Sequence, residues 1–157
     1  MATIGYIEDL REIIGHRRVI LNGSCAVLVN AQNELLMQQR NEPQKRWGLP
    51  GGLMELGETT RATVVREVAE ECGIRLDPAA LTLLNVYADG QMRTAANGDQ
   101  FDIVNTAYYA EKIEGTPHVN DAESLQYCWI PLDQLPSNIP RNHRQAIEDY
   151  LKLKRQK

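Results

Sequence analysis

The chain has 157 residues, the size of one domain, and its 43% apolar and 24% charged residues are typical of a globular protein. The net charge of −4 argues against nucleic acid or a membrane surface as the expected partner. This charge is uneven, because five acidic and only two basic residues lie between Glu55 and Glu71. That segment carries a charge of −3, and the rest of the chain is nearly neutral.

The three cysteines, Cys25, Cys72 and Cys128, are an odd number and include no CxxC pair, which excludes a typical disulfide framework or zinc site. The first 20 residues are charged throughout and contain no signal-peptide core. No apolar run approaches the roughly 18 residues that a membrane-spanning helix needs. We therefore expect a cytoplasmic protein.

In the first third of the chain, apolar residues at near-helical spacing predict a helix over residues 7–14, and Gly15 can end it. The β-branched, apolar run 19–29 predicts a strand. Residues 30–33 resemble a turn, so 35–39 is expected to return as the hairpin partner of that strand. The Gly- and Pro-rich stretch 47–57 predicts a shaped loop or short strand.

The remainder of the chain continues to alternate helices and strands. A helix is expected over 59–72, with Gly73 as its C-terminal stop. Apolar patterning predicts strands and a final helix, in chain order over residues 81–88, 101–110, 125–130 and 141–153. Strands interspersed with helices indicate a mixed sheet covered by helices.

The predicted helix 59–72 carries its glutamates on one face. At about 100° per residue, Glu67, Glu70 and Glu71 lie on this face, opposite the valines and small residues. Like charges one turn apart cost about a few tenths of a kcal/mol, and Arg66 offsets only part of this repulsion. A solvated acidic face is one interpretation. A site for hard divalent cations, which bind carboxylates, is the other.

The residues around the helix distinguish these interpretations. Gly52 is followed after five residues by Glu58 and, after seven more, by Arg66-Glu67-Val68-Ala69-Glu70-Glu71-Cys72-Gly73-Ile74. This pattern resembles the complete signature of the Nudix hydrolases: G, five residues, E, seven residues, then R-E-U-x-E-E-x-G-U, where U is aliphatic. All seven fixed and both aliphatic positions match. Two flanking segments are also common features of the family, Trp47-Gly48-Leu49-Pro50-Gly51-Gly52 and Trp129-Ile130-Pro131-Leu132-Asp133.

The resemblance implies an α/β/α sandwich with a mixed β-sheet, formed by residues 1–157 as a single domain with residues 1–17 as a helical extension. It implies hydrolysis of a diphosphate bond with Mg²⁺ or Mn²⁺. Glu70 and Glu71 would then be the main metal ligands. Glu67 would bind a further ion or orient the attacking water, and the backbone carbonyl of Gly52 would complete one metal shell.

The resemblance also implies supporting and catalytic roles outside the metal ligands. Arg66 would hold the glutamates in place by salt bridges, and Glu58 would support the loop–helix junction. Many family members supply a general base from a loop after the signature. Asp121 and Glu123 lie in such a position, and we favour Glu123; an ordinary polar loop is the alternative.

The sequence leaves the substrate open. Gly90 stands where many ADP-ribose pyrophosphatases have proline, and Gln91 and Met92 stand where dinucleoside-polyphosphate hydrolases have tyrosine. Our first hypothesis is hydrolysis of a nucleoside diphosphate linked to another group, such as ADP-ribose or a sugar nucleotide. The alternatives are a nucleoside-triphosphate pyrophosphohydrolase that sanitises the nucleotide pool and a non-catalytic ligand-binding module. The helix predicted over 7–14 lies outside the expected core fold and is a candidate homodimer contact.

Overall fold

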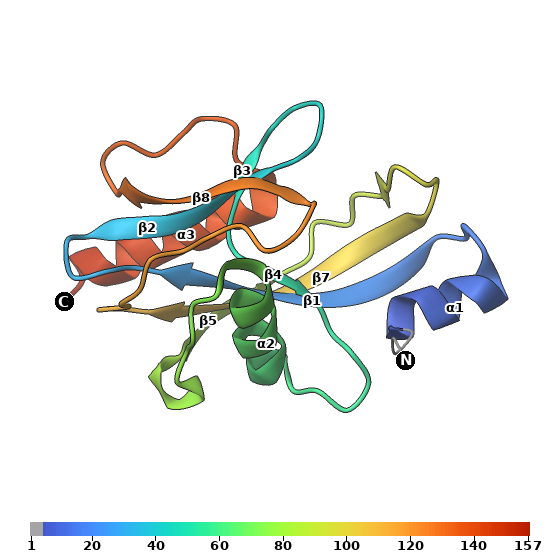
Figure 1. Ribbon diagram of the computed structural model, residues 1–157, viewed down its shortest axis with the longest axis horizontal. Helices are drawn as coiled ribbons and strands as arrows, with labels where there is room; N and C mark the ends of the chain where they lie inside the picture. The colour runs from blue at the N-terminus through green and yellow to red at the C-terminus, as the bar shows by residue number, and fades with distance from the viewer. Residues whose placement is uncertain (1–4) are drawn as a thin grey trace.

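The computed structural model describes residues 5–157, so the first four residues of the predicted extension lie outside the described residues (Figure 1). Its elements in chain order are α1 (Tyr6–Ile14), β1 (Val19–Leu28), β2 (Glu34–Arg40), β3 (Trp47–Gly48), β4 (Gly51–Leu53), α2 (Thr60–Cys72), a 3₁₀ turn (Pro78–Ala80), β5 (Thr82–Tyr87), β6 (Arg93–Thr94), β7 (Gln100–Ala110), β8 (Ser124–Pro131) and α3 (Arg141–Arg155). None of the helices in this range has the length and apolar character needed to cross a membrane.

The strands form two sheets. In the larger one, β1 runs parallel to β7 from Val19↔Phe101 to Leu28↔Ala110 and antiparallel to β4, giving the order β4-β1-β7-β5, with β6 also paired to β7. The smaller sheet has the order β3-β2-β8 and is antiparallel throughout. The predicted mixed sheet is therefore confirmed, and a separate antiparallel sheet accompanies it.

Helices α2 and α3 lie on opposite sides of the sheets (Figure 1). Successive residues of a strand point to opposite faces, so β1 contributes to two cores. Ala26 and Leu28 pack with the α2 side chains, whereas Val27 packs with those of α3. Burial of both strand faces explains why residues 25–28 at the end of β1 are continuously apolar. The three layers confirm the expected α/β/α sandwich.

The expected hairpin between residues 19–29 and 35–39 is wrong. After the turn, only the isolated antiparallel bridge Val29↔Leu35 joins the two segments. β2 then pairs with β3 and β8 in the smaller sheet, while β1 pairs with β4 and β7. Sequence proximity favours hairpin pairing, but both strands gain longer ladders from partners that are distant in the chain.

Helix α1 lies beside the N-terminal ends of β1 and β7 (Figure 1). Its Arg11 donates a hydrogen bond to the carbonyl of Gln100 at 2.8 Å, and the Tyr6 amide donates to the Glu55 carboxylate at 2.8 Å. The helix ends at Gly15, whose φ of 64° is readily adopted only by glycine. Ile13 remains 83% exposed, so part of the apolar side of α1 has no cover within the described chain.

Candidate active site

Helix α2 presents the signature residues because both of its ends are fixed. At the N-terminus, the Thr59 hydroxyl accepts a hydrogen bond from the Ala62 amide at 3.0 Å. At the C-terminus, Gly73 adopts φ 78° and its amide donates to the carbonyl of Ala69 at 3.0 Å. Val64 and Val68 are fully buried against the sheet, which fixes the rotation of the helix and hence the direction of its glutamates.

Arg66 joins the loop to the helix. Its Nε and Nη2 each donate to the carboxylate of Glu58 at 2.9 Å, and Nη1 donates to Glu67 at 2.9 Å and to Glu70 at 3.1 Å. Nη2 also donates to the carbonyl of Leu53 at 3.1 Å. One guanidinium thus satisfies three carboxylates and a carbonyl, in the geometry that the fork of arginine permits.

The hydrogen bonds from Arg66 hold the pKa of the Glu58 carboxyl below its usual range. Glu58 also accepts a hydrogen bond from the Glu55 amide at 2.8 Å. Its carboxylate therefore bridges the loop before α2 and the middle of that helix. This arrangement supports the expected role of Glu58 at the loop–helix junction.

Glu67 and Glu71 are turned inward. Burial raises the pKa of Glu67, and burial together with the charge of Glu67 raises the pKa of Glu71 to about 9. Glu71 is only 8% exposed, and its carboxylate accepts a hydrogen bond from the hydroxyl of Tyr127 at 3.0 Å. Gly52 leaves room for Glu67, because a Cβ at position 52 would lie 2.4 Å from the carboxyl carbon of Glu67.

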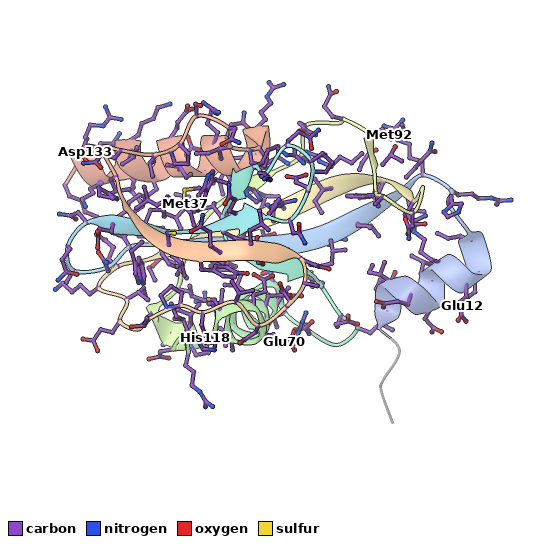
Figure 2. The ribbon with its side chains drawn as sticks, turned by 45° about the horizontal axis from the view of Figure 1, so that its top comes forward. Glu12, Met37, Glu70, Met92, His118 and Asp133 are labelled. Carbon is purple, nitrogen blue, oxygen red and sulfur yellow. The ribbon has the colours of Figure 1, made fainter. Side chains whose placement is uncertain are left out.

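Glu70 differs from its two neighbours. Its side chain is 61% exposed and lies at the outer surface of α2 (Figure 2), where its charge is paired with Arg66. Within residues 5–157, no three acidic, histidine or cysteine side chains are already grouped in a metal-binding geometry. The donor chemistry still fits a divalent cation. The carboxyl groups of Glu67 and Glu71 lie one helical turn apart, Glu71 buried and Glu67 partly buried, and oxygen ligands of this type suit Mg²⁺.

The segment before β8 reaches the same region. The Asn120 amide donates to the carbonyl of Glu71 at 3.2 Å. Burial is the main reason that the pKa of Tyr127 is raised, and the nearby charge of Asp121 adds a small part. The charge of Glu123 acts instead on Arg40. Within the described chain, no hydrogen bond joins the carboxylate of either candidate base to α2. The structure therefore places Asp121 near Tyr127 and Glu123 near Arg40.

Sequence reasoning missed three polar residues with buried side-chain atoms, Arg40, Asn142 and His143, of which Arg40 and His143 lie beside Gly48. Burial lowers the pKa of Arg40, whose Nε is buried without an acceptor in the described chain. Asn142, only 4% exposed, has a buried Oδ1 without a donor there. His143 is buried and accepts a hydrogen bond from the Leu49 amide at 3.0 Å. The start of α3 packs on Gly48, which buries these side chains.

Tyr127 was also missed, although its position on the last predicted strand was known. Its contact with Glu71 joins residues 56 positions apart. The available signal was alternation: Tyr127 and Trp129 lie on the same face of β8, and both contact the core beneath α2. A buried hydroxyl on that face needs a hydrogen-bond partner, and α2 is the helix packed against it.

The NUDIX domain profile matches residues 21–150 of this chain. The chain is 30% identical over 141 residues to the ADP-ribose pyrophosphatase of Methanocaldococcus jannaschii, covering 87% of this chain and 78% of that protein. It is 36% identical over 117 residues to the 8-oxo-dGDP phosphatase NUDT18 of Homo sapiens, covering 71% of this chain and 32% of that protein. A MutT NUDIX hydrolase structure from Burkholderia pseudomallei superposes with a TM-score of 0.68 at 32% identity, covering 83% and 98% of the two chains.

An α/β/α sandwich that carries a carboxylate-rich helix bound to the preceding loop by one arginine is the arrangement of a hydrolase. The profile match over most of the chain and the 30% identity to a relative agree with this class. The chain belongs to the Nudix hydrolase family.

Proposed function

We propose that this protein hydrolyses the diphosphate bond of a nucleoside diphosphate linked to another group, of the ADP-ribose or sugar-nucleotide type. The observation that carries the proposal is the arginine-organised carboxylate array of α2. The named activity of the Methanocaldococcus jannaschii relative supports the choice of substrate class. The products would be two monophosphates.

Glu67, Glu70 and Glu71 would hold Mg²⁺ or Mn²⁺, with the carbonyl of Gly52 as a further ligand. When bound, the cation would neutralise the diphosphate and make water a better nucleophile. Arg66 keeps the glutamates on one side of α2, so the charges that receive the substrate are prearranged. Glu123 would take the proton from the attacking water.

Two buried polar atoms support a nucleotide as the substrate. Arg40 Nε lacks an acceptor and Asn142 Oδ1 lacks a donor within the described chain. Arg40 lies beside Gly48, and Asn142 of α3 directly precedes His143, which also lies beside Gly48. Buried polar atoms without partners are costly, so an arriving ligand that satisfies them gains affinity. A nucleotide offers phosphate oxygens to the guanidinium and amino groups to the amide oxygen.

A second candidate is hydrolysis of oxidised purine nucleotides, including nucleoside triphosphates, in a nucleotide-sanitising reaction. The 36% identity to the human 8-oxo-dGDP phosphatase favours it. A triphosphate would yield a monophosphate and pyrophosphate, and a diphosphate would yield a monophosphate and phosphate. Product analysis therefore separates the two candidates.

The test is a panel of ADP-ribose, sugar nucleotides, 8-oxo-dGDP and 8-oxo-dGTP with Mg²⁺ or Mn²⁺, followed by identification of the products. Glu70→Gln is the diagnostic variant, because the exposed Glu70 can be changed without loss of core packing. We expect loss of metal-dependent turnover with the fold intact. Full activity of this variant would contradict the mechanism, and a wild-type protein that binds these nucleotides without turnover would favour the non-catalytic module.

We also propose α1 as a homodimer contact, because Ile13 and Ile20 are 83% and 67% exposed at the same end of the molecule. Ile13→Glu should convert a dimer to a monomer in light scattering. A wild-type monomer at high concentration would contradict this contact.

A further inference from the structure

A chain of hydrogen bonds runs from the smaller sheet to helix α2. Gln38 Nε2 donates to the Ser124 hydroxyl at 2.6 Å, Ser124 donates to the Tyr127 hydroxyl at 3.1 Å, and Tyr127 donates to the Glu71 carboxylate at 3.0 Å. We call these three bonds the Gln38–Glu71 relay. All four side chains are at most 8% exposed, so the relay is shielded from water along its length.

The fold builds the relay from three elements. Gln38 of β2 and Tyr127 of β8 are direct partners in the antiparallel ladder, so both side chains lie on one face of the smaller sheet. Ser124 is at the start of β8, three residues before Tyr127. Glu71 comes from α2, in the layer packed against that face. The relay therefore fixes a signature glutamate to a sheet that contains none of the signature.

The direction of the relay is set at its first bond. The amide nitrogen of Gln38 can only donate, so the Ser124 oxygen accepts from it and directs its own proton to Tyr127. The Tyr127 oxygen accepts this hydrogen bond, and its own hydroxyl group donates to Glu71. Each donor is polarised by the one before it, which strengthens the final bond to the carboxylate in this buried setting.

The restraint opposes a force that would move Glu71. Glu71 is only 8% exposed, so the cost of burying its polar carboxyl group favours rotation toward solvent unless hydrogen bonds hold it in place. The Tyr127 hydroxyl donates to Oε2 of Glu71 and so ties the carboxyl group to the smaller sheet. Outer hydrogen bonds of this kind orient metal-ligating side chains, and removing them typically weakens metal affinity about 10- to 100-fold.

We infer that Tyr127, supported by Ser124 and Gln38, is a positioning residue that holds Glu71 in the orientation required to bind the divalent cation. This assignment rests on the proposed function, because it concerns the same metal site. It extends the site to residues of β2 and β8.

The test is Mn²⁺ affinity, measured by electron paramagnetic resonance of free Mn²⁺, in the wild type and in Tyr127→Phe. The matched control is Tyr87→Phe, which removes another tyrosine–carboxylate hydrogen bond, the one to Asp149 at 2.6 Å, far from α2 in the packing of the chain. We expect Tyr127→Phe to weaken Mn²⁺ binding about tenfold and Tyr87→Phe to leave it unchanged. Ser124→Ala, which interrupts the relay but keeps Tyr127, should weaken binding by a smaller factor.

Thermal unfolding of the same variants separates positioning from general stability. Wild-type Mn²⁺ affinity in Tyr127→Phe would overturn the assignment while leaving the proposed function standing, and so would equal losses in Tyr127→Phe and Tyr87→Phe. If Tyr127→Phe does not fold, Mn²⁺ affinity is compared between Ser124→Ala and the wild type instead, and an unchanged affinity in Ser124→Ala would overturn the assignment. A wild-type protein that binds no Mn²⁺ would overturn the proposed function, and this assignment with it.

Discussion

The carboxylate of Glu67 occupies the space that a side chain at position 52 would need. An ideal Cβ at Gly52 would lie 2.4 Å from the carboxyl carbon of Glu67 and 2.5 Å from its Oε1. The glycine in the signature is therefore explained by close approach of the Glu67 side chain. Its φ is not in the left-handed region, so backbone conformation is not the reason.

Gly52→Ala should displace Glu67 and lower kcat at least tenfold with the fold retained. The measurement is turnover of the best substrate of the nucleotide panel, with circular dichroism as a check on folding. The matched control is Gly90→Ala, because a Cβ at Gly90 meets nothing within 4 Å. The positive φ of 70° at Gly90 makes the control lose about 1 kcal/mol of stability, yet its turnover should equal that of the wild type. Equal turnover in both variants would refute the steric explanation.

Arg66→Lys tests whether the fork of the guanidinium, and not its charge alone, organises the site. Lysine keeps the charge but cannot donate to Glu58, Glu67 and Glu70 together, so we expect a tenfold or greater loss of kcat and a loss of about 1–3 kcal/mol of unfolding free energy. The control is Arg46→Lys, which changes another bidentate arginine, bound to Glu42 at 2.8 and 2.9 Å. That variant should retain its turnover; a loss as large as that of Arg66→Lys would contradict a specific role for Arg66.

His143 makes the stability of the protein depend on pH. Burial lowers the pKa of His143 from the usual 6.5 to about 3. Between these values the unfolded chain binds a proton that the folded protein does not, so the free energy of unfolding falls as the pH falls from 6.5 toward 3. His143→Gln should flatten this dependence, by at most about 1.4 kcal/mol per pH unit, because glutamine is uncharged and can still accept from Leu49.

Urea unfolding at a series of pH values measures the effect. The control is His118→Gln, which replaces an exposed histidine of the loop after β7. It should leave the slope between pH 6.5 and 4 unchanged. An unchanged slope in His143→Gln, or an equal change in both variants, would show that His143 is not the source.

The parts of the site that could be predicted from sequence are those fixed by short-range geometry. Helical spacing places Glu70 one turn after Arg66, and the structure contains that ion pair. The ion pair from Arg66 to Glu67 was implied only by the family resemblance, and the structure contains it as well. Thr59 and Gly73 also begin and end the helix as local patterns indicate. The alternative interpretation, a solvated acidic face, does not hold for Glu71, which is only 8% exposed and is covered by Tyr127 of the smaller sheet.

The remaining features depend on pairings across the chain. The Gln38–Glu71 relay needs the register of β2 and β8, which lie more than 80 residues apart, and the burial of His143 needs the docking of α3 on Gly48. Periodicity indicates which face of each element is buried but not which element covers it. For the same reason the sequence does not predict that β1 and β2 belong to different sheets, because each strand alone has the residue pattern of a hairpin strand.

Mutation of Glu123 and Asp121 separates the two candidates for the general base. Glu123 lies on the Arg40 side of the loop before β8, and its carbonyl accepts a hydrogen bond from the Asn41 amide at 2.8 Å. Asp121 lies on the Tyr127 side, and its carboxylate accepts a hydrogen bond from the Glu123 amide at 3.2 Å. The Asp121 carboxylate thus shapes the loop, and the exposed Glu123 side chain is free to reach a bound water. Glu123→Gln should therefore lower kcat about 100-fold with little change in KM, while Asp121→Asn should keep kcat within about threefold. The reverse pattern in steady-state kinetics would assign proton transfer to Asp121, and two small effects would leave Glu67 to orient and activate the water alone.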